Sequence, residues 1–146
     1  MPRRRPNTFW VRSNYFRLAV LYLIGAFCLD ASIFVLAWIW PELWFQLFHD
    51  KLPTALEVAL LRRSAGQWAA FAIVQAITLA CWRKHPVWLA VGAGARFSDL
   101  ATDLSYLISV PNLTGWGWVA FLPPAPLNLL GFFLLMKCYG IASKTG

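Results

Sequence analysis

Four ionisable residues stand inside runs that are otherwise apolar, and they are the residues of this chain best suited to chemistry. Asp30 lies in the first long apolar run, and Arg96, Asp99 and Asp103 lie in the third. A charged group costs on the order of 3 kcal/mol at the centre of a bilayer, so such groups normally face a protein interior and pair there. The spacings of three and four residues in the third run place its charges on one helical face. We therefore predict that these charges pair with groups on other helices.

Depth along the expected helices predicts how these charges pair. Arg96 and Asp99 lie near the middle of their run, as Asp30 does in the first, so the two carboxylates could share one guanidinium. Asp103 lies nearer the outer end, where it could meet an arginine at the start of the second run, which would leave the site approximately neutral. The predicted intramembrane charge network comprises Asp30, Arg62, Arg63, Arg96, Asp99 and Asp103.

Two interpretations of this network stay open. It could clamp helices together, because apolar contacts contribute little to helix association inside lipid. It could instead form a polar pocket or a proton-accessible site. Facing carboxylates perform acid–base chemistry when one is kept protonated and the other ionised, whereas a guanidinium between them favours the ionised form of both. That consideration weighs against catalysis, and the sequence assigns no catalytic residue.

The elements that position these charges follow from composition. Of 146 residues, 60% are hydrophobic and only 13% charged, which is too little polar surface for a water-soluble globule of this size. A spanning helix needs roughly 20 mostly apolar residues, so four spans use nearly the whole chain. We predict an all-α fold, a four-helix transmembrane bundle in a single membrane domain, with spans at about residues 18–40, 58–82, 87–110 and 119–139.

Basic residues near the span ends predict the orientation. One side would carry nine of them: Arg3, Arg4, Arg5, Arg12, Arg17, Arg83, Lys84, Lys137 and Lys144. The other side would carry three: Lys51, Arg62 and Arg63. The positive-inside rule then places the basic leader over residues 1–17 in the cytoplasm, and an even number of spans returns the carboxyl terminus there. We expect an integral protein of a bacterial inner membrane.

Several functional classes lack support in the sequence. The net charge of +7 comes from residues that flank apolar runs, so it fits membrane topology better than nucleic-acid binding. Neither His49 nor His85 lies within a span, which leaves a haem without an intramembrane histidine ligand. Three widely separated cysteines match neither a disulfide framework nor a zinc cluster, so we interpret them as buried packing residues and expect no metal site.

The layout resembles that of the small four-helix bacterial DoxX-like membrane proteins. A proline, Pro41, closes the first span, and the second opens with Leu-Arg-Arg-Ser-Ala-Gly over residues 61–66, similar to that family's Leu-Arg followed by small residues. The third span carries Arg96 with Ser98 and an aspartate, Asp99 or Asp103, downstream. The resemblance implies a four-helix bundle and no settled activity.

Two hypotheses of function remain. The first is a non-catalytic accessory or structural subunit of a larger membrane complex, such as an energy-converting one, with the bilayer and other membrane subunits as partners. The alternative is a small membrane enzyme, or a quinone- or lipid-binding protein, that uses the buried Asp and Arg residues. In that case a quinone carbonyl or a lipid headgroup could replace one partner in a salt bridge.

Overall fold

The computed structural model describes residues 8–110 and 112–144, with side chains from residue 14 onward. The described chain is all-helical. Its helices are α1 (Thr8–Ile39), α2 (Pro41–His49), α3 (Ala55–Cys81), α4 (Val87–Ser109), α5 (Gly115–Phe121) and α6 (Pro124–Ala142).

Three helical stretches are long and apolar enough to cross a membrane, and they indicate an integral membrane protein. They are Asn14–Ile39 in α1, Ala55–Cys81, which is α3, and Gly115–Ala142, which covers α5 and α6. The helix α4 is of comparable length, at 23 residues, but holds Arg96, Asp99 and Asp103 close together near its middle. Length and composition therefore mark three spans, where the sequence analysis predicted four.

The helix boundaries differ from the predicted spans in two places. First, α1 already begins at Thr8, so the part of the predicted leader that the structure describes is continuous with the first long helix. Second, the fourth apolar run is divided into α5 and α6 at Leu122 and Pro123. Proline has no amide hydrogen and disfavours a helical conformation in the residue before it, so the prolines at 123, 124 and 126 favour a new helix start there.

Side-chain caps fix the starts of α3 and α5. Thr54 accepts a hydrogen bond from the amide of Glu57, whose carboxylate accepts one from the amide of Thr54 at 2.8 Å. Thr114 accepts from the amide of Gly117, while its own hydroxyl donates to the carbonyl of Leu47 at 2.7 Å. The capping box places Glu57 inside α3, and the second cap also ties α5 to α2.

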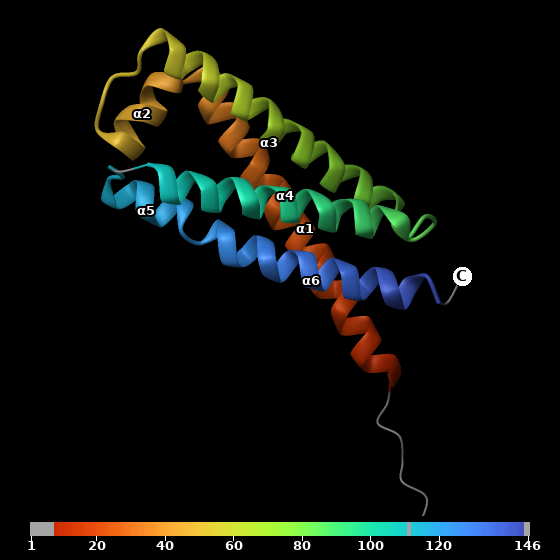
Figure 1. The fold of residues 1–146 in the computed structure, drawn as a ribbon. Helices are drawn as coiled ribbons and strands as arrows, with labels where there is room; N and C mark the ends of the chain where they lie inside the picture. Colours follow the sequence, from red (N-terminus) through yellow and green to blue (C-terminus); the bar gives the residue numbers. More distant parts are fainter. Residues whose placement is uncertain (1–7, 111, 145–146) are drawn as a thin grey trace, which may run out of the picture.

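The long helices form a bundle with a distinct end at each side (Figure 1). In it α1 packs along α3 and α4 packs along α6. One end holds α2, α5, the start of α3 and the end of α4, and we call it the α2–α5 end. The opposite end holds the start of α1, the turn between α3 and α4 and the end of α6. Both ends of the described chain therefore lie at the same end of the bundle.

Two apolar clusters fill the bundle, one towards each end. The first joins α1, α4 and α6 through Ala19, Leu23, Leu89, Ala93, Leu135 and Cys138. The second joins α1, α2, α3 and α5 through Ala37, Trp44, Phe48, Leu61, Ala65 and Phe121. Between them along the helices lie the buried polar residues Asp30, Gln75, Arg96, Asp99 and Asn128. The core is thus two apolar layers separated by a polar one.

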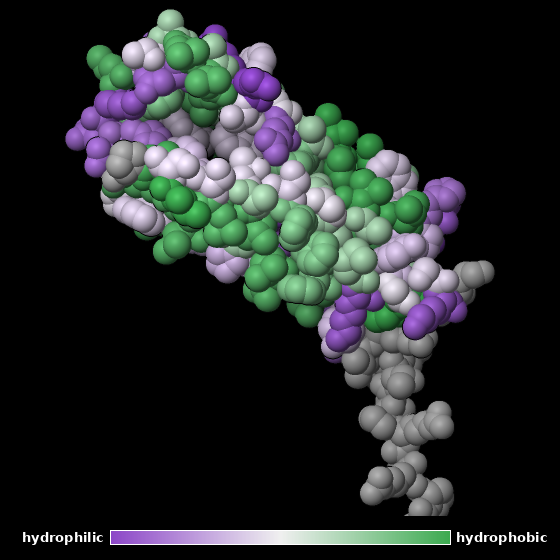
Figure 2. All heavy atoms as spheres, in the orientation of Figure 1, coloured by the Kyte–Doolittle hydropathy of each residue, from purple (hydrophilic) through white to green (hydrophobic). Residues whose placement is uncertain are grey.

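The surface has the pattern expected of a protein in lipid. Hydrophobic residues cover the middle of the face seen in Figure 2, and hydrophilic residues gather at its two ends. Large apolar side chains point outward from every long helix, among them Leu21, Ile73, Ile108 and Leu130. In water such exposure would be costly, whereas in lipid it is not.

Candidate functional site

Arg96 is the centre of the polar layer. Its side chain is 2% exposed, and its Nη2 lies 2.7 Å from Oδ2 of Asp30 on α1. Its Nη1 lies 3.4 Å from Oδ2 of Asp99, one turn further along α4, and donates to Oδ1 of Asn128 on α6 at 3.3 Å. The spacing of Arg96 and Asp99 already placed them on one face. One guanidinium therefore links three helices.

Asn128 connects the last member of the charged face. Its Nδ2 donates to Oδ2 of Asp99 and to Oδ2 of Asp103, each at 2.9 Å. The sequence analysis did not include this residue in the network. The available signal was an amide side chain in an apolar run just after three prolines. Asn128 lets Asp103 join the network without an ion pair.

The predicted pairing of Asp103 with Arg62 or Arg63 is wrong. Both arginines are exposed on α3, and Nε of Arg62 donates to the carbonyl of Trp38 at 3.4 Å. Among the described residues, the ion pairs of the polar layer are those of Arg96 with Asp30 and with Asp99. Arg62 and Arg63 lie near the start of α3, where their long side chains can reach the end of the bundle instead of entering it.

Further groups complete the surroundings of Arg96. Gln75 on α3 donates from Nε2 to Oδ2 of Asp30 at 2.7 Å, and the ring of Phe71 lies 5.2 Å from the guanidinium carbon. The ring of Tyr22 on α1 packs directly on Gly131, where an added Cβ would lie 2.0 Å from the ring carbon Cζ. We call Asp30, Gln75, Arg96, Asp99, Asp103 and Asn128 the charge network.

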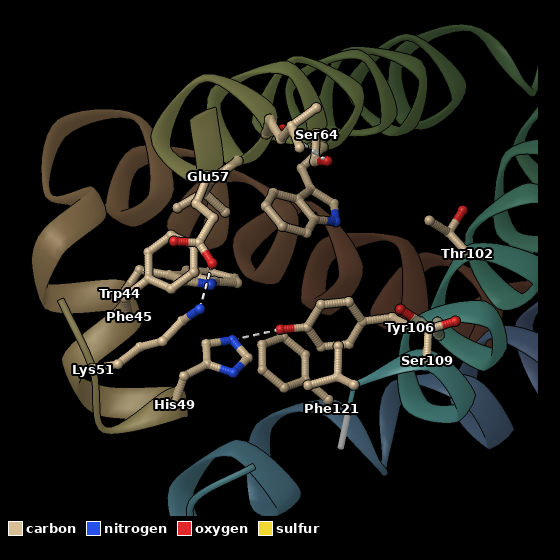
Figure 3. A pocket seen from close by; sticks show the side chains of 15 residues that line it. Trp44, Phe45, His49, Lys51, Glu57, Ser64, Thr102, Tyr106, Ser109 and Phe121 are labelled. Atoms are coloured by element: carbon tan, nitrogen blue, oxygen red, sulfur yellow. Dashed lines mark hydrogen bonds and ion pairs between the residues drawn. The ribbon is translucent and has the colours of Figure 1, made fainter. Parts of the chain in front are cut away.

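A pocket lies near the α2–α5 end of the bundle (Figure 3), and Asp103 of the charge network is one of its lining residues. It has a volume of about 470 Å³ and lies between α2, α3 and α4, with Phe121 contributed by α5. Five aromatic side chains line it: Trp44, Phe45, Trp68, Tyr106 and Phe121. Asp103 is part of the lining and also bonds to Asn128, so the pocket and the charge network share this carboxylate. We call this cavity the aromatic pocket.

Two polar pairs stand at the outer part of the aromatic pocket. Lys51 forms an ion pair with Glu57, and the hydroxyl of Tyr106 lies 2.6 Å from Nε2 of His49. Partial burial lowers the pKa of His49, and nearby Lys51 lowers it further, against the opposing effects of the Asn112 backbone and Glu57. His49 is therefore neutral at pH 7 and can accept or donate one hydrogen bond to the tyrosine.

The chemistry that this arrangement offers is recognition of a molecule with both polar and apolar parts. Pockets for small molecules typically combine apolar walls with a few placed polar groups in about 300–1,000 Å³. In the described part of the chain, no group of three or more His, Cys, Asp or Glu side chains could hold a metal ion. The prediction that the cysteines are buried is wrong for Cys28, which is exposed, while Cys138 is buried.

No protein-family model, no curated protein sequence and no solved structure matches this chain.

Proposed function

We propose that α4 is a fourth membrane span and that the protein is a four-helix transmembrane bundle. Arg96 and Asp99 are 2% and 5% exposed, so these two charges of α4 are shielded from lipid. The residues that α4 exposes include the apolar side chains Val91, Phe97 and Ile108. A helix that turns charges inward and apolar groups outward can cross a bilayer as part of a bundle.

We further propose that both termini are cytoplasmic. The end of the bundle that holds the start of α1 and the end of α6 also carries Arg17, Arg83, Lys84, Lys137 and Lys144. The α2–α5 end carries all three acids outside the network, Glu42, Asp50 and Glu57. This distribution follows the positive-inside rule. Membership of the DoxX-like group, and with it a bacterial inner membrane, remains our proposal from the resemblance.

Cysteine labelling tests this topology. In a chain whose native cysteines are replaced by serine, Lys84→Cys and Asp50→Cys place single thiols at opposite ends of the bundle. A membrane-impermeant maleimide applied to intact cells should label the Asp50→Cys chain alone, and both chains after lysis. Labelling of the Lys84→Cys chain in intact cells would contradict the proposed orientation.

The function that the geometry supports best is binding of a small amphipathic molecule at the aromatic pocket. One observation carries this proposal: an aromatic-walled cavity of about 470 Å³ reaches a carboxylate of the buried charge network. The apolar wall suits the body of such a molecule, and the shared carboxylate suits its polar head. Quinones and lipids are amphipathic, so this proposal develops the second of the two hypotheses from the sequence.

Purification under mild conditions tests this function. The tagged chain is extracted in dodecylmaltoside, and the small molecules that remain bound are identified by native mass spectrometry. We expect one tightly held molecule per chain. The pocket-filling variant Ser64→Trp should lose it, because Ser64 lines the aromatic pocket. Its control, Ser98→Trp, changes an exposed serine of α4 outside that lining and should retain the molecule.

The same purification also distinguishes ligand binding from the other hypothesis, an accessory subunit of a larger membrane complex. An accessory subunit of a larger complex would elute with other membrane proteins in fixed proportion. A large assembly of constant composition with an empty aromatic pocket would favour that function over ligand binding. A bound molecule that survives in Ser64→Trp would place the ligand elsewhere on the protein.

A further inference from the structure

The charge network holds more carboxylates than cations. Asp30, Asp99 and Asp103 contribute three carboxylates, and Arg96 is the one cation within ion-pairing distance of any of them among the described residues. The sequence analysis expected approximate neutrality because it assigned an arginine of α3 to Asp103. In a medium of low polarity an unpaired carboxylate is costly, so such groups are normally paired with a cation or neutralised. The described charge network therefore has three acidic side chains and one basic one.

Among the described residues, Asp103 is the carboxylate of these three that contacts no cation. Asp30 and Asp99 each contact the guanidinium of Arg96, whereas the partner of Asp103 is the neutral amide of Asn128. Asp103 is also the member of the charge network that lines the aromatic pocket. The other ionised groups of the pocket, Lys51 and Glu57, form an ion pair with each other. The pocket therefore holds one carboxyl group without a cationic partner.

The wall of the pocket suits an organic cation. Rings of Trp, Tyr and Phe attract a cation at their faces, most strongly where water is excluded, and aromatic cages bind quaternary ammonium groups in this way. In the aromatic pocket, Trp44 lies 5.3 Å from Trp68 and 5.5 Å from Phe121 between ring centroids, so these rings form a continuous cluster. The ring of Tyr106 packs on Phe121 at 4.9 Å.

Other ligand classes fit these groups less well. A divalent metal ion requires several oxygen ligands, and Asp103 is the one carboxylate of the lining that is not already paired. An anion would lie against the carboxyl group of Asp103 and would be repelled by its ionised form. A neutral molecule would leave this carboxyl group without a cationic partner.

We propose that the ligand of the aromatic pocket is an organic ammonium ion with an apolar body, bound with its charge at Asp103 and its body against the rings. This inference rests on the proposed binding function and narrows its ligand class. The ammonium group could belong to a free amine or to a lipid headgroup, and both present the same chemistry to the pocket.

Binding of a matched pair of probes tests the inference. The probes are benzyltrimethylammonium, which is cationic, and neopentylbenzene, its neutral carbon isostere. Tritiated benzyltrimethylammonium is equilibrated by dialysis with the protein in dodecylmaltoside micelles, which carry neither charge nor ammonium groups. Neopentylbenzene is measured as a competitor, and empty micelles give the background. We expect the cation to bind with an affinity higher by about tenfold or more.

Variants locate the binding site. Asp103→Asn retains an oxygen to accept from Asn128 but removes the charge, and it should reduce the affinity for the cation by about tenfold or more. The control Asp50→Asn changes an exposed acid outside the pocket and should bind as the wild type does. Trp68→Leu leaves the charge network intact and should weaken binding of the cation more than that of the isostere. Trp68→Leu therefore tests the inference even if Asp103→Asn does not fold.

The outcomes separate this inference from the binding function on which it rests. Equal affinity for the two probes, both lost in Ser64→Trp, would overturn the cationic ligand and leave an apolar binding pocket. No binding of either probe would overturn both proposals. Cation binding that is unchanged in Asp103→Asn and Trp68→Leu would place the site elsewhere and overturn the inference. Competition by added phosphatidylcholine, but not by phosphatidylglycerol, would identify the lipid headgroup as the source of the ammonium group.

Discussion

Replacing Arg96 with glutamine should cost more stability than the loss of its hydrogen bonds alone can explain. Arg96 makes three polar contacts, to Asp30, Asp99 and Asn128. Side-chain hydrogen bonds inside membrane proteins average about 0.6 kcal/mol, so three of them account for about 2 kcal/mol. Removing one member of a buried ion pair costs about 3–5 kcal/mol, because the remaining charge is left unpaired. We expect Arg96→Gln to lower the free energy of unfolding by that larger amount.

A triple variant separates these two contributions. Asp30→Asn and Asp99→Asn combined with Arg96→Gln remove the guanidinium together with both carboxylates that contact it. If unpaired charge is the dominant cost, the triple variant should be more stable than Arg96→Gln alone, although it carries two more substitutions. Unfolding is followed by circular dichroism as sodium dodecyl sulfate is added to protein in dodecylmaltoside.

A matched control and two possible results test whether unpaired charge is the main cost of Arg96→Gln. Arg62→Gln changes an exposed arginine outside the charge network and should unfold close to the wild type. An Arg96→Gln variant that loses less than about 2 kcal/mol would show that hydrogen bonding suffices as an explanation. A triple variant less stable than the single one would refute the role assigned to unpaired charge.

Three further predictions concern other parts of the site. Gly131→Ala should destabilise the protein by about 1–3 kcal/mol, because the new methyl group would overlap the ring of Tyr22, whereas Gly94→Ala, whose added methyl group would have no atom within 4 Å, should not; thermal unfolding of both variants tests this. Asn128→Leu should cost about 1–3 kcal/mol for each buried partner left unsatisfied, and wild-type stability in chemical unfolding would contradict its linking role. Burial lowers the pKa of His49, so the folded state resists its protonation, and thermal stability should fall as the pH drops below about 6.5; His49→Gln should flatten that dependence, and an unchanged slope would assign it to other groups.

The sequence predicted part of the charge network but missed the contact that joins Asp103 to it. The spacing of Arg96, Asp99 and Asp103 defines a helical face without any tertiary information. Depth along the chain was enough to relate Asp30 to Arg96, because both lie midway along their apolar runs. The same argument failed for Asp103, since it chose a partner by charge and depth, and the group within reach is the neutral amide of Asn128.

The aromatic pocket could not be predicted from the sequence. Its wall brings together residues of α2, α3, α4 and α5 that are far apart along the chain. Aromatic residues such as Trp44 and Phe121 are equally typical of membrane interfaces, so their presence in the sequence did not indicate a cavity. The hydrogen bond from Thr114, at the start of α5, to Leu47 of α2 holds these two helices together at the aromatic pocket.

By itself the sequence determined that this chain forms long apolar helices and that a few charges must be turned away from lipid. Both conclusions are local, because a segment in a bilayer has to satisfy its backbone hydrogen bonds internally and the cost of a charge depends on its immediate surroundings. The tertiary structure alone decided which charges are paired, which carboxylate lacks a cation and where a pocket opens. Those outcomes depend on the lateral packing of helices and on the reach of single side chains, which apolar periodicity does not encode.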